Sequence, residues 1–99
     1  MTAEDQLRSL VATWRKSQDS LYASVMQAPS LYMGCIRLVR ATADRMADLE
    51  DAEGLLREFR EGDPDLVASA ADDLELPQLE FLDFDQVRNA AFYLRYQEI

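Results

Sequence analysis

The sequence predicts an all-α fold, and both its composition and its spacing support that prediction. Apolar residues make up 48% of the chain, and most of them are leucine and alanine, which favour helices over strands. Three glycines among 99 residues offer fewer turns than a strand-rich fold needs. Apolar side chains also recur at three- and four-residue steps over long stretches. We therefore expect one domain, residues 1–99, built as a long antiparallel helical hairpin with two shorter helices packed across it, similar to a four-helix bundle.

The first helix is expected over about residues 3–28. Thr2 is a suitable N-cap, and Glu4 and Asp5 place negative charge near the positive end of the helix dipole. Pro29 ends or sharply kinks this helix because proline cannot continue the backbone hydrogen bonds. An apolar stripe runs along the helix and consists of Leu7, Leu10, Val11, Trp14, Leu21 and Val25.

The second helix, over about residues 30–61, is expected to be the longest and to fold back on the first. Gly54 weakens it locally by about 1 kcal/mol relative to alanine, so a bend is expected there. Two helices of this length have more apolar surface than two short helices can cover, so we expect a second copy of the chain to cover the rest. The inner face carries Cys35, Val39, Thr42, Met46, Leu49 and Leu56.

The sequence Gly62, Asp63, Pro64 marks the end of one helix and the start of the next. Glycine suits the left-handed backbone position that follows a helix, aspartate can cap the next helix, and proline fits its first position. A short third helix is therefore expected over residues 64–74. An extended connection over residues 75–83 is expected to follow, because a proline interrupts its partial two-residue alternation.

The last helix is predicted over residues 84–98. Asp83 and Gln86 have the spacing of a capping box, and Leu82 and Val87 occupy the positions of a hydrophobic staple. The inner face of this helix is expected to contain Phe84, Val87, Ala91 and Leu94.

Negative charge is concentrated in the second half of the chain. The net charge is −9, but residues 1–49 sum to +1 and residues 50–99 to −10. Residues 61–85 hold nine acidic side chains and no basic one. This distribution predicts one face with a negative field. It argues against direct nucleic-acid binding, because affinity for phosphates depends on uncompensated positive charge.

The sequence points to the cytoplasm, and its preference for arginine over lysine resembles the usage of GC-rich bacterial genomes. Its single cysteine, Cys35, forms no internal disulfide and so requires no oxidising compartment. The acidic start at residues 1–5 does not resemble a secretory signal. No run approaches the ~20 apolar residues of a membrane-spanning helix.

The residue types argue against an enzyme. The chain has no histidine, and so lacks the commonest general base and metal ligand. Cys35 is expected to be a small buried thiol rather than an activated thiolate. The acidic pairs do not fit the twelve-residue calcium loop, since Val67 stands where a further ligand is needed. We therefore expect no catalytic residue, no cofactor and no metal.

The function predicted from these features is that of a non-catalytic interaction module: an adaptor, inhibitor or regulatory subunit that binds another protein with a basic surface and forms homo-oligomers. Charge complementarity would set the choice of partner, and apolar contacts would supply affinity. The residues expected to bind the partner are three acids and three aromatic residues that cannot all lie on one helix face: Asp72, Asp73, Glu75, Phe92, Tyr93 and Tyr96.

Three alternative functions remain open. The triplet Asp19-Ser20-Leu21 resembles the attachment site of acyl and peptidyl carrier proteins, which implies a carrier-like domain modified at Ser20; the serine of that family, however, opens a helix after a loop. The acidic segment 61–85 has the charge needed to mimic a nucleic acid and inhibit a protein that binds one. A small-molecule pocket between helices is the third alternative, lined by Trp14, Tyr22, Tyr32 and Phe59.

Overall fold

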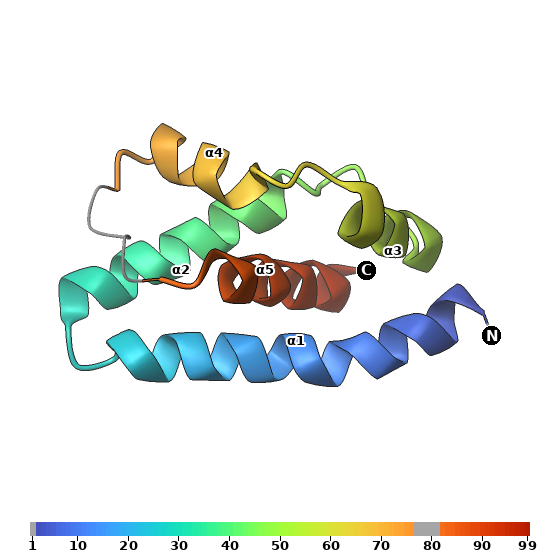
Figure 1. Ribbon diagram of the computed structural model, residues 1–99, viewed down its shortest axis with the longest axis horizontal. Helices are drawn as coiled ribbons and strands as arrows, with labels where there is room; N and C mark the ends of the chain where they lie inside the picture. Colours follow the sequence, from blue (N-terminus) through green and yellow to red (C-terminus); the bar gives the residue numbers. More distant parts are fainter. Residues whose placement is uncertain (1, 77–81) are drawn as a thin grey trace.

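Five helices form the part of the chain that the computed structural model describes, residues 2–76 and 82–99. The helices pack against one another, so the prediction of an all-α, bundle-like fold is confirmed. These described residues contain no strand. The helices span about 41 × 24 × 19 Å (Figure 1). In chain order they are α1 (Ala3–Val25), α2 (Pro29–Asp44), α3 (Ala52–Glu61), α4 (Leu66–Asp73) and α5 (Phe84–Glu98).

Helix α1 begins where the sequence predicts. The Thr2 hydroxyl accepts a hydrogen bond from the backbone N–H of Asp5, and the Asp5 carboxylate accepts one from the backbone N–H of Thr2. This reciprocal pair satisfies two of the N–H groups that a helix start leaves without a partner. The helix ends at Val25 rather than at residue 28, and a short turn leads into α2.

The prediction of one helix over residues 30–61 is wrong. Helix α2 ends at Asp44, the chain turns over residues 45–51, and α3 begins at Ala52. The Asp51 carboxylate caps α3 by accepting the backbone N–H of Gly54 at 2.7 Å. Gly54 therefore lies in the first turn of α3 and not at a bend. Met46 lies within this turn, and its side chain is nevertheless buried in the core, where it is 2% exposed.

Gly62 does not adopt the left-handed conformation predicted for it, since its φ is −70°. A glycine is needed there for a different reason: a Cβ atom would lie 2.3 Å from the Glu58 carbonyl oxygen. Asp63 accepts the backbone N–H of Asp65 at 2.8 Å, and α4 begins at Leu66 rather than at Pro64.

Helix α5 is the main neighbour of α1, and it lies between α1 and α2 (Figure 1). Helices α1 and α2 contact each other, and the last helix packs across both, as the sequence predicts, so that the apolar stripe of the first helix is covered within the same chain. The reason given for expecting a second copy along this stripe no longer holds.

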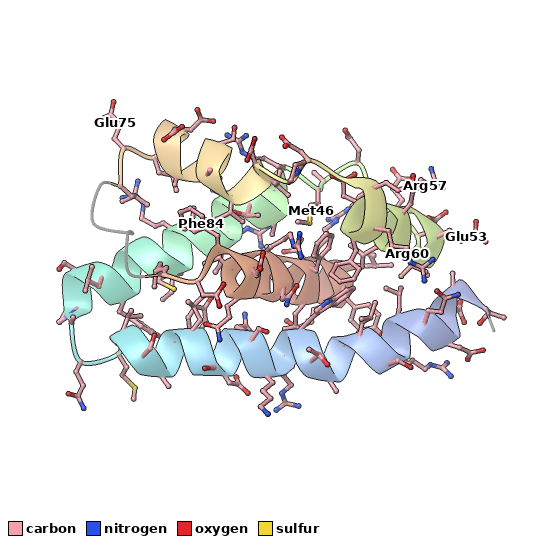
Figure 2. The ribbon with its side chains drawn as sticks, in the orientation of Figure 1. Met46, Glu53, Arg57, Arg60, Glu75 and Phe84 are labelled. Carbon is pink, nitrogen blue, oxygen red and sulfur yellow. The ribbon has the colours of Figure 1, made fainter. Side chains whose placement is uncertain are left out.

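Asp83 caps α5 as predicted, accepting the backbone N–H groups of Asp85 and Gln86. Phe84 is 42% exposed instead of facing inward (Figure 2).

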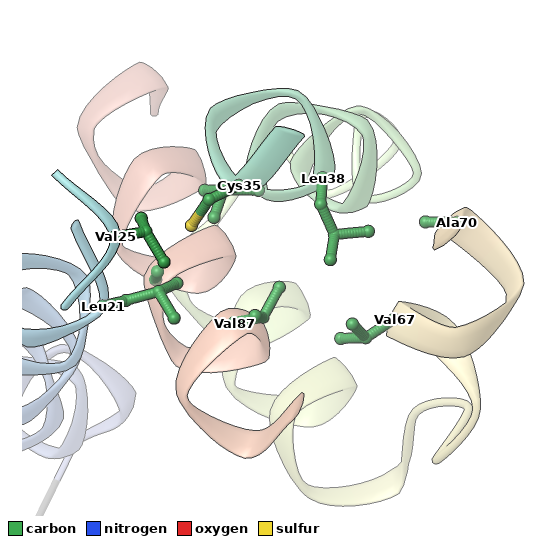
Figure 3. Close-up of a cluster of buried hydrophobic side chains, with 9 residues drawn as sticks. Leu21, Val25, Cys35, Leu38, Val67, Ala70 and Val87 are labelled. Carbon is green, nitrogen blue, oxygen red and sulfur yellow. The ribbon is translucent and has the colours of Figure 1, made fainter. Parts of the chain in front are cut away.

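Buried apolar side chains form two clusters, and α5 contributes to both. The first, here called the turn-end cluster, gathers side chains from α1, α2, α4 and α5 (Figure 3). It consists of Leu21, Val25, Cys35, Leu38, Val39, Val67, Ala70, Val87 and Ala90. The second, the aromatic cluster, consists of Leu7, Trp14, Ala43, Met46, Leu55, Leu56, Leu66, Ala91 and Phe92, with Phe59 packed against it.

The turn between α2 and α3 is held by Arg95 of α5. Its guanidinium donates hydrogen bonds to the carbonyl oxygens of Ala47 at 2.8 Å and Leu49 at 2.6 Å, and to the Glu98 carboxylate at 3.3 Å. The side chain of Arg95 is only 15% exposed. Backbone oxygens of the turn that have no helical partner are thereby satisfied.

Candidate functional site

Three of the predicted partner-binding residues gather where α4 ends, a region here called the acidic end of α4. Asp72, Asp73 and Glu75 are all exposed there. Arg45, which directly follows α2 and which the sequence reasoning did not identify, donates to the Asp73 carboxylate and to the Ser69 hydroxyl. The ion pairs formed within residues 2–76 and 82–99 include neither Asp72 nor Glu75. Two of the three carboxylates are therefore available to another molecule.

The backbone at the acidic end of α4 forms a Schellman motif. The N–H of Leu76 donates to the carbonyl of Ala71 at 3.4 Å, and the N–H of Glu75 donates to the carbonyl of Asp72 at 3.1 Å. This pattern puts the residue after the helix in the left-handed region, and Glu75 has a φ of 53°. Glycine is the usual residue at such a position because a Cβ atom is crowded there. Glu75 therefore carries a side chain at a position where the backbone conformation favours glycine.

Electrostatics also oppose this arrangement of acids. The C-terminal end of a helix carries partial negative charge, so carboxylates close to it are repelled. No basic residue lies in the last turn of α4, and among the described residues only Asp73 of these three acids has a cation beside it. A hollow of about 360 Å³ adjoins this end and is lined by Ala71, Asp72, Glu75 and Leu76. A positively charged group placed there would relieve the repulsion between the carboxylates and the helix end.

Other acids of the segment 61–85 have local structural roles. The Asp63 and Asp83 carboxylates accept backbone N–H groups at the starts of α4 and α5. Residues 77–81, which fall in the predicted extended connection, lie outside the described residues. The remaining acids of the described segment, Glu61, Asp65 and Asp85, are exposed as well, so the acidic end of α4 holds part of the negative surface.

The three aromatic residues predicted to bind a partner have different surroundings. Phe92 is 1% exposed and stacks on Trp14, with ring centroids 5.3 Å apart, so it belongs to the core and is not available at the surface. Tyr93 and Tyr96 are half-buried beside the aromatic cluster, and the Tyr93 hydroxyl accepts a hydrogen bond from Gln97 at 3.0 Å.

The predicted residues do not form one site. Tyr96 belongs to the last turns of α5, and the C-terminal end of this helix lies away from Glu75 (Figures 1 and 2). The three acids lie together at the end of α4, and the aromatic residues of α5 lie apart from them.

The four aromatic residues of the predicted small-molecule pocket do not line a common cavity. Trp14 and Phe59 meet in the aromatic cluster with ring centroids 5.2 Å apart. Tyr22 and Tyr32 pack 5.8 Å apart beside the turn-end cluster. Each pair fills space in a different part of the molecule.

Ser20 is exposed within α1, where helix precedes and follows it. The resemblance to carrier proteins requires a serine that opens a helix, and this placement departs from that requirement. Cys35 is buried in the turn-end cluster, as predicted, and burial raises the pKa of its thiol to about 11. The thiol is therefore protonated and poorly nucleophilic at neutral pH.

Residues 2–76 and 82–99 contain no group of three or more acidic, cysteine or histidine side chains placed to hold a metal ion. Within the same described ranges, no helix combines the length and the apolar character needed to cross a membrane.

Compared with known protein families, curated proteins and solved structures, the chain shows no significant match to any of them.

Proposed function

We propose that this chain is a cytoplasmic, non-catalytic interaction module, an adaptor, inhibitor or regulatory subunit, that binds a protein with a basic surface through the acidic end of α4. The observation that supports the proposal is the pair Asp72 and Glu75. Both carboxylates are exposed, take part in none of the ion pairs within the described part of the chain, and stand at the negative end of a helix.

The two carboxylates are unfavourably placed at the negative end of α4, and this cost in stability is the physical reason for proposing a function. A lysine or glycine at position 75 would agree better with the helix dipole or with the left-handed backbone. Residues that break local preferences are found disproportionately at functional sites. A cationic partner group would turn the repulsion among these carboxylates into attraction, and would also accelerate encounter with the partner.

The test compares three forms of the full chain as bait in host extract at low salt. The first is the wild type, and the second carries Asp72→Lys and Glu75→Lys. Asp73 is left unchanged because its contact with Arg45 joins α4 to α2. The third carries Asp19→Lys and Asp48→Lys, which make the same change in net charge at exposed positions elsewhere.

The proposal predicts a protein that the wild type and the third form retain and the second form loses. The rate constant for association of this protein with the purified chain should be about tenfold lower for the second form than for the wild type. The difference should shrink as salt is added. Equal capture and equal rates for the second and third forms would contradict the proposal. A captured protein that normally binds nucleic acid would specify the partner as one inhibited by charge mimicry.

A further inference from the structure

A groove lies at the end of the molecule opposite the acidic end of α4. The first turns of α1 and α3 and the last turn of α5 meet there because the chain turns at residues 45–51 and starts a new helix. The first hollow of this end groove has a volume of about 440 Å³. Its lining consists of Glu4, Leu7, Arg8, Glu50, Asp51, Ala52, Tyr96 and Ile99.

A second hollow of about 530 Å³ continues the end groove, since both hollows are lined by Glu4, Asp51 and Ala52. The floor of the first hollow is apolar. Leu7 is buried, Tyr96 is half-buried, and Ile99 is 52% exposed. Displacement of water from such a floor by another apolar group is favourable in free energy.

The rim of the end groove is negative. Four acids and one base line the two hollows: Glu4, Glu50, Asp51, Glu53 and Arg8. None of these five side chains takes part in an ion pair with the described residues. Asp51 caps α3 and Glu4 lies in the first turn of α1, where the helix dipole favours an acid. Glu50 has neither role, so its charge is fully available to an occupant.

We propose that the end groove binds a segment of a partner protein in which arginine or lysine residues alternate with apolar residues. The apolar side chains would cover Leu7, Tyr96 and Ile99. The cationic groups would pair with Glu4 and Glu50. This surface is independent of the acidic end of α4, and two docking surfaces at opposite ends allow one chain to bridge two proteins.

The charges around the end groove also give its occupant a direction. A third hollow, of about 320 Å³, adjoins the second through Ala3 and Glu53. Arg57 and Arg60 of α3 line this third hollow (Figure 2). Glu53 and Glu61 line the third hollow as well, so its charges balance, and the cationic groups of the occupant are favoured at the Glu50 side, where acids are in excess.

The test uses a synthetic pentapeptide, acetyl-Leu-Arg-Ala-Leu-Arg-amide, titrated into the isotope-labelled full chain and followed by NMR. We expect the largest shifts at the amides of Leu7, Ala52 and Tyr96. Replacing both Glu4 and Glu50 by glutamine should raise the dissociation constant about fivefold, as expected for two exposed ion pairs. Both acids are exposed and neither side chain makes a hydrogen bond with the described residues, so the fold should be retained.

Two controls separate the end groove from net charge. Asp72→Asn with Glu75→Gln makes the same change in charge at the acidic end of α4 and should leave the dissociation constant unchanged. Arg57→Gln should leave it unchanged or lower it. Equal losses for the two double variants, shifts centred on α4, or no saturable binding would each overturn the proposal. Because the peptide is added to the isolated chain, none of these results depends on binding at the acidic end of α4.

Discussion

At the scale of single residues, Glu75 shows a conflict between backbone preference and charge. Its φ of 53° lies in the left-handed region, where a side chain costs about 1–2 kcal/mol relative to the right-handed helix. It also adds a carboxylate to the negative end of α4. The hydrogen bonds of the Schellman motif hold this conformation in place.

Replacing Glu75 by glycine should stabilise the protein. Glycine reaches the left-handed region without strain, and the substitution also removes an unfavourable charge, so the free energy of unfolding should rise by about 1 kcal/mol. Urea denaturation at pH 7 measures the change. Glu75→Gln is the matched control, since it removes the charge but keeps the Cβ atom, and it should recover only a few tenths of a kcal/mol. Equal effects of the two substitutions would show that the backbone conformation contributes nothing.

At the scale of helices and turns, the connection between α2 and α3 is held by one partly buried cation. Arg95 joins the last helix to the carbonyls of Ala47 and Leu49, which lie almost fifty residues earlier in the chain. Hydrogen bonds from a charged donor contribute more than neutral ones. Removing the donor also leaves those carbonyls without their partner.

Replacing Arg95 by methionine should lower the free energy of unfolding by about 2 kcal/mol, because a charge-assisted contact is lost while most of the apolar stem is kept. Hydrogen exchange should show reduced protection first in residues 45–51. Arg37→Met at an exposed position of α2 should change stability by less than about 0.5 kcal/mol. Unaltered exchange at the turn in the Arg95 variant would show that the turn is held by other contacts.

The sequence predicted those elements whose ends carry their own hydrogen-bonding signals. Thr2 with Asp5 and Asp83 with Gln86 gave the starts of α1 and α5, because capping is a local interaction. The break at residues 45–51 was missed because Met46 and Leu49, which lie within it, continue the helical spacing of the apolar residues before and after it. Asp51, three residues before Gly54, was the available signal for a new helix. It was hidden by the continuous apolar pattern.

The candidate site could be predicted only in part, for a similar reason. Exposed carboxylates at Asp72, Asp73 and Glu75 follow from their charge alone. The burial of Phe92 does not follow from the sequence of α5, because this helix is surrounded by others and so buries more than one narrow stripe. The end groove could not be found before the break at residues 45–51 was known, since that break brings Glu50 and Ala52 next to α1.

At the scale of the whole molecule, α5 joins the two apolar clusters. Val87 and Ala90 belong to the turn-end cluster, whereas Ala91 and Phe92 belong to the aromatic cluster. Because α5 contributes side chains to both clusters, disruption of one cluster should also destabilise the other. We therefore expect the two clusters to unfold together.

Replacing Val87 by alanine tests this coupling. The side chain is completely buried, so the free energy of unfolding should fall by about 2 kcal/mol through lost contacts and a residual cavity. Trp14 fluorescence, which reports on the aromatic cluster, should shift to the same lower denaturant midpoint as the helical circular dichroism signal. Val67→Ala, which removes a turn-end side chain outside α5, should shift both signals together as well. A fluorescence midpoint that stays at the wild-type value would mean that the clusters unfold separately.

The position of α5 also affects how the chain folds while it is being made. A ribosome releases α1 to α4 before α5, so the apolar faces that α5 later covers remain in contact with water during translation. Nascent chains in this state are targets for chaperones and proteases. We expect the core to close only once α5 has emerged from the ribosome, so that the first four helices wait for the fifth before they fold stably.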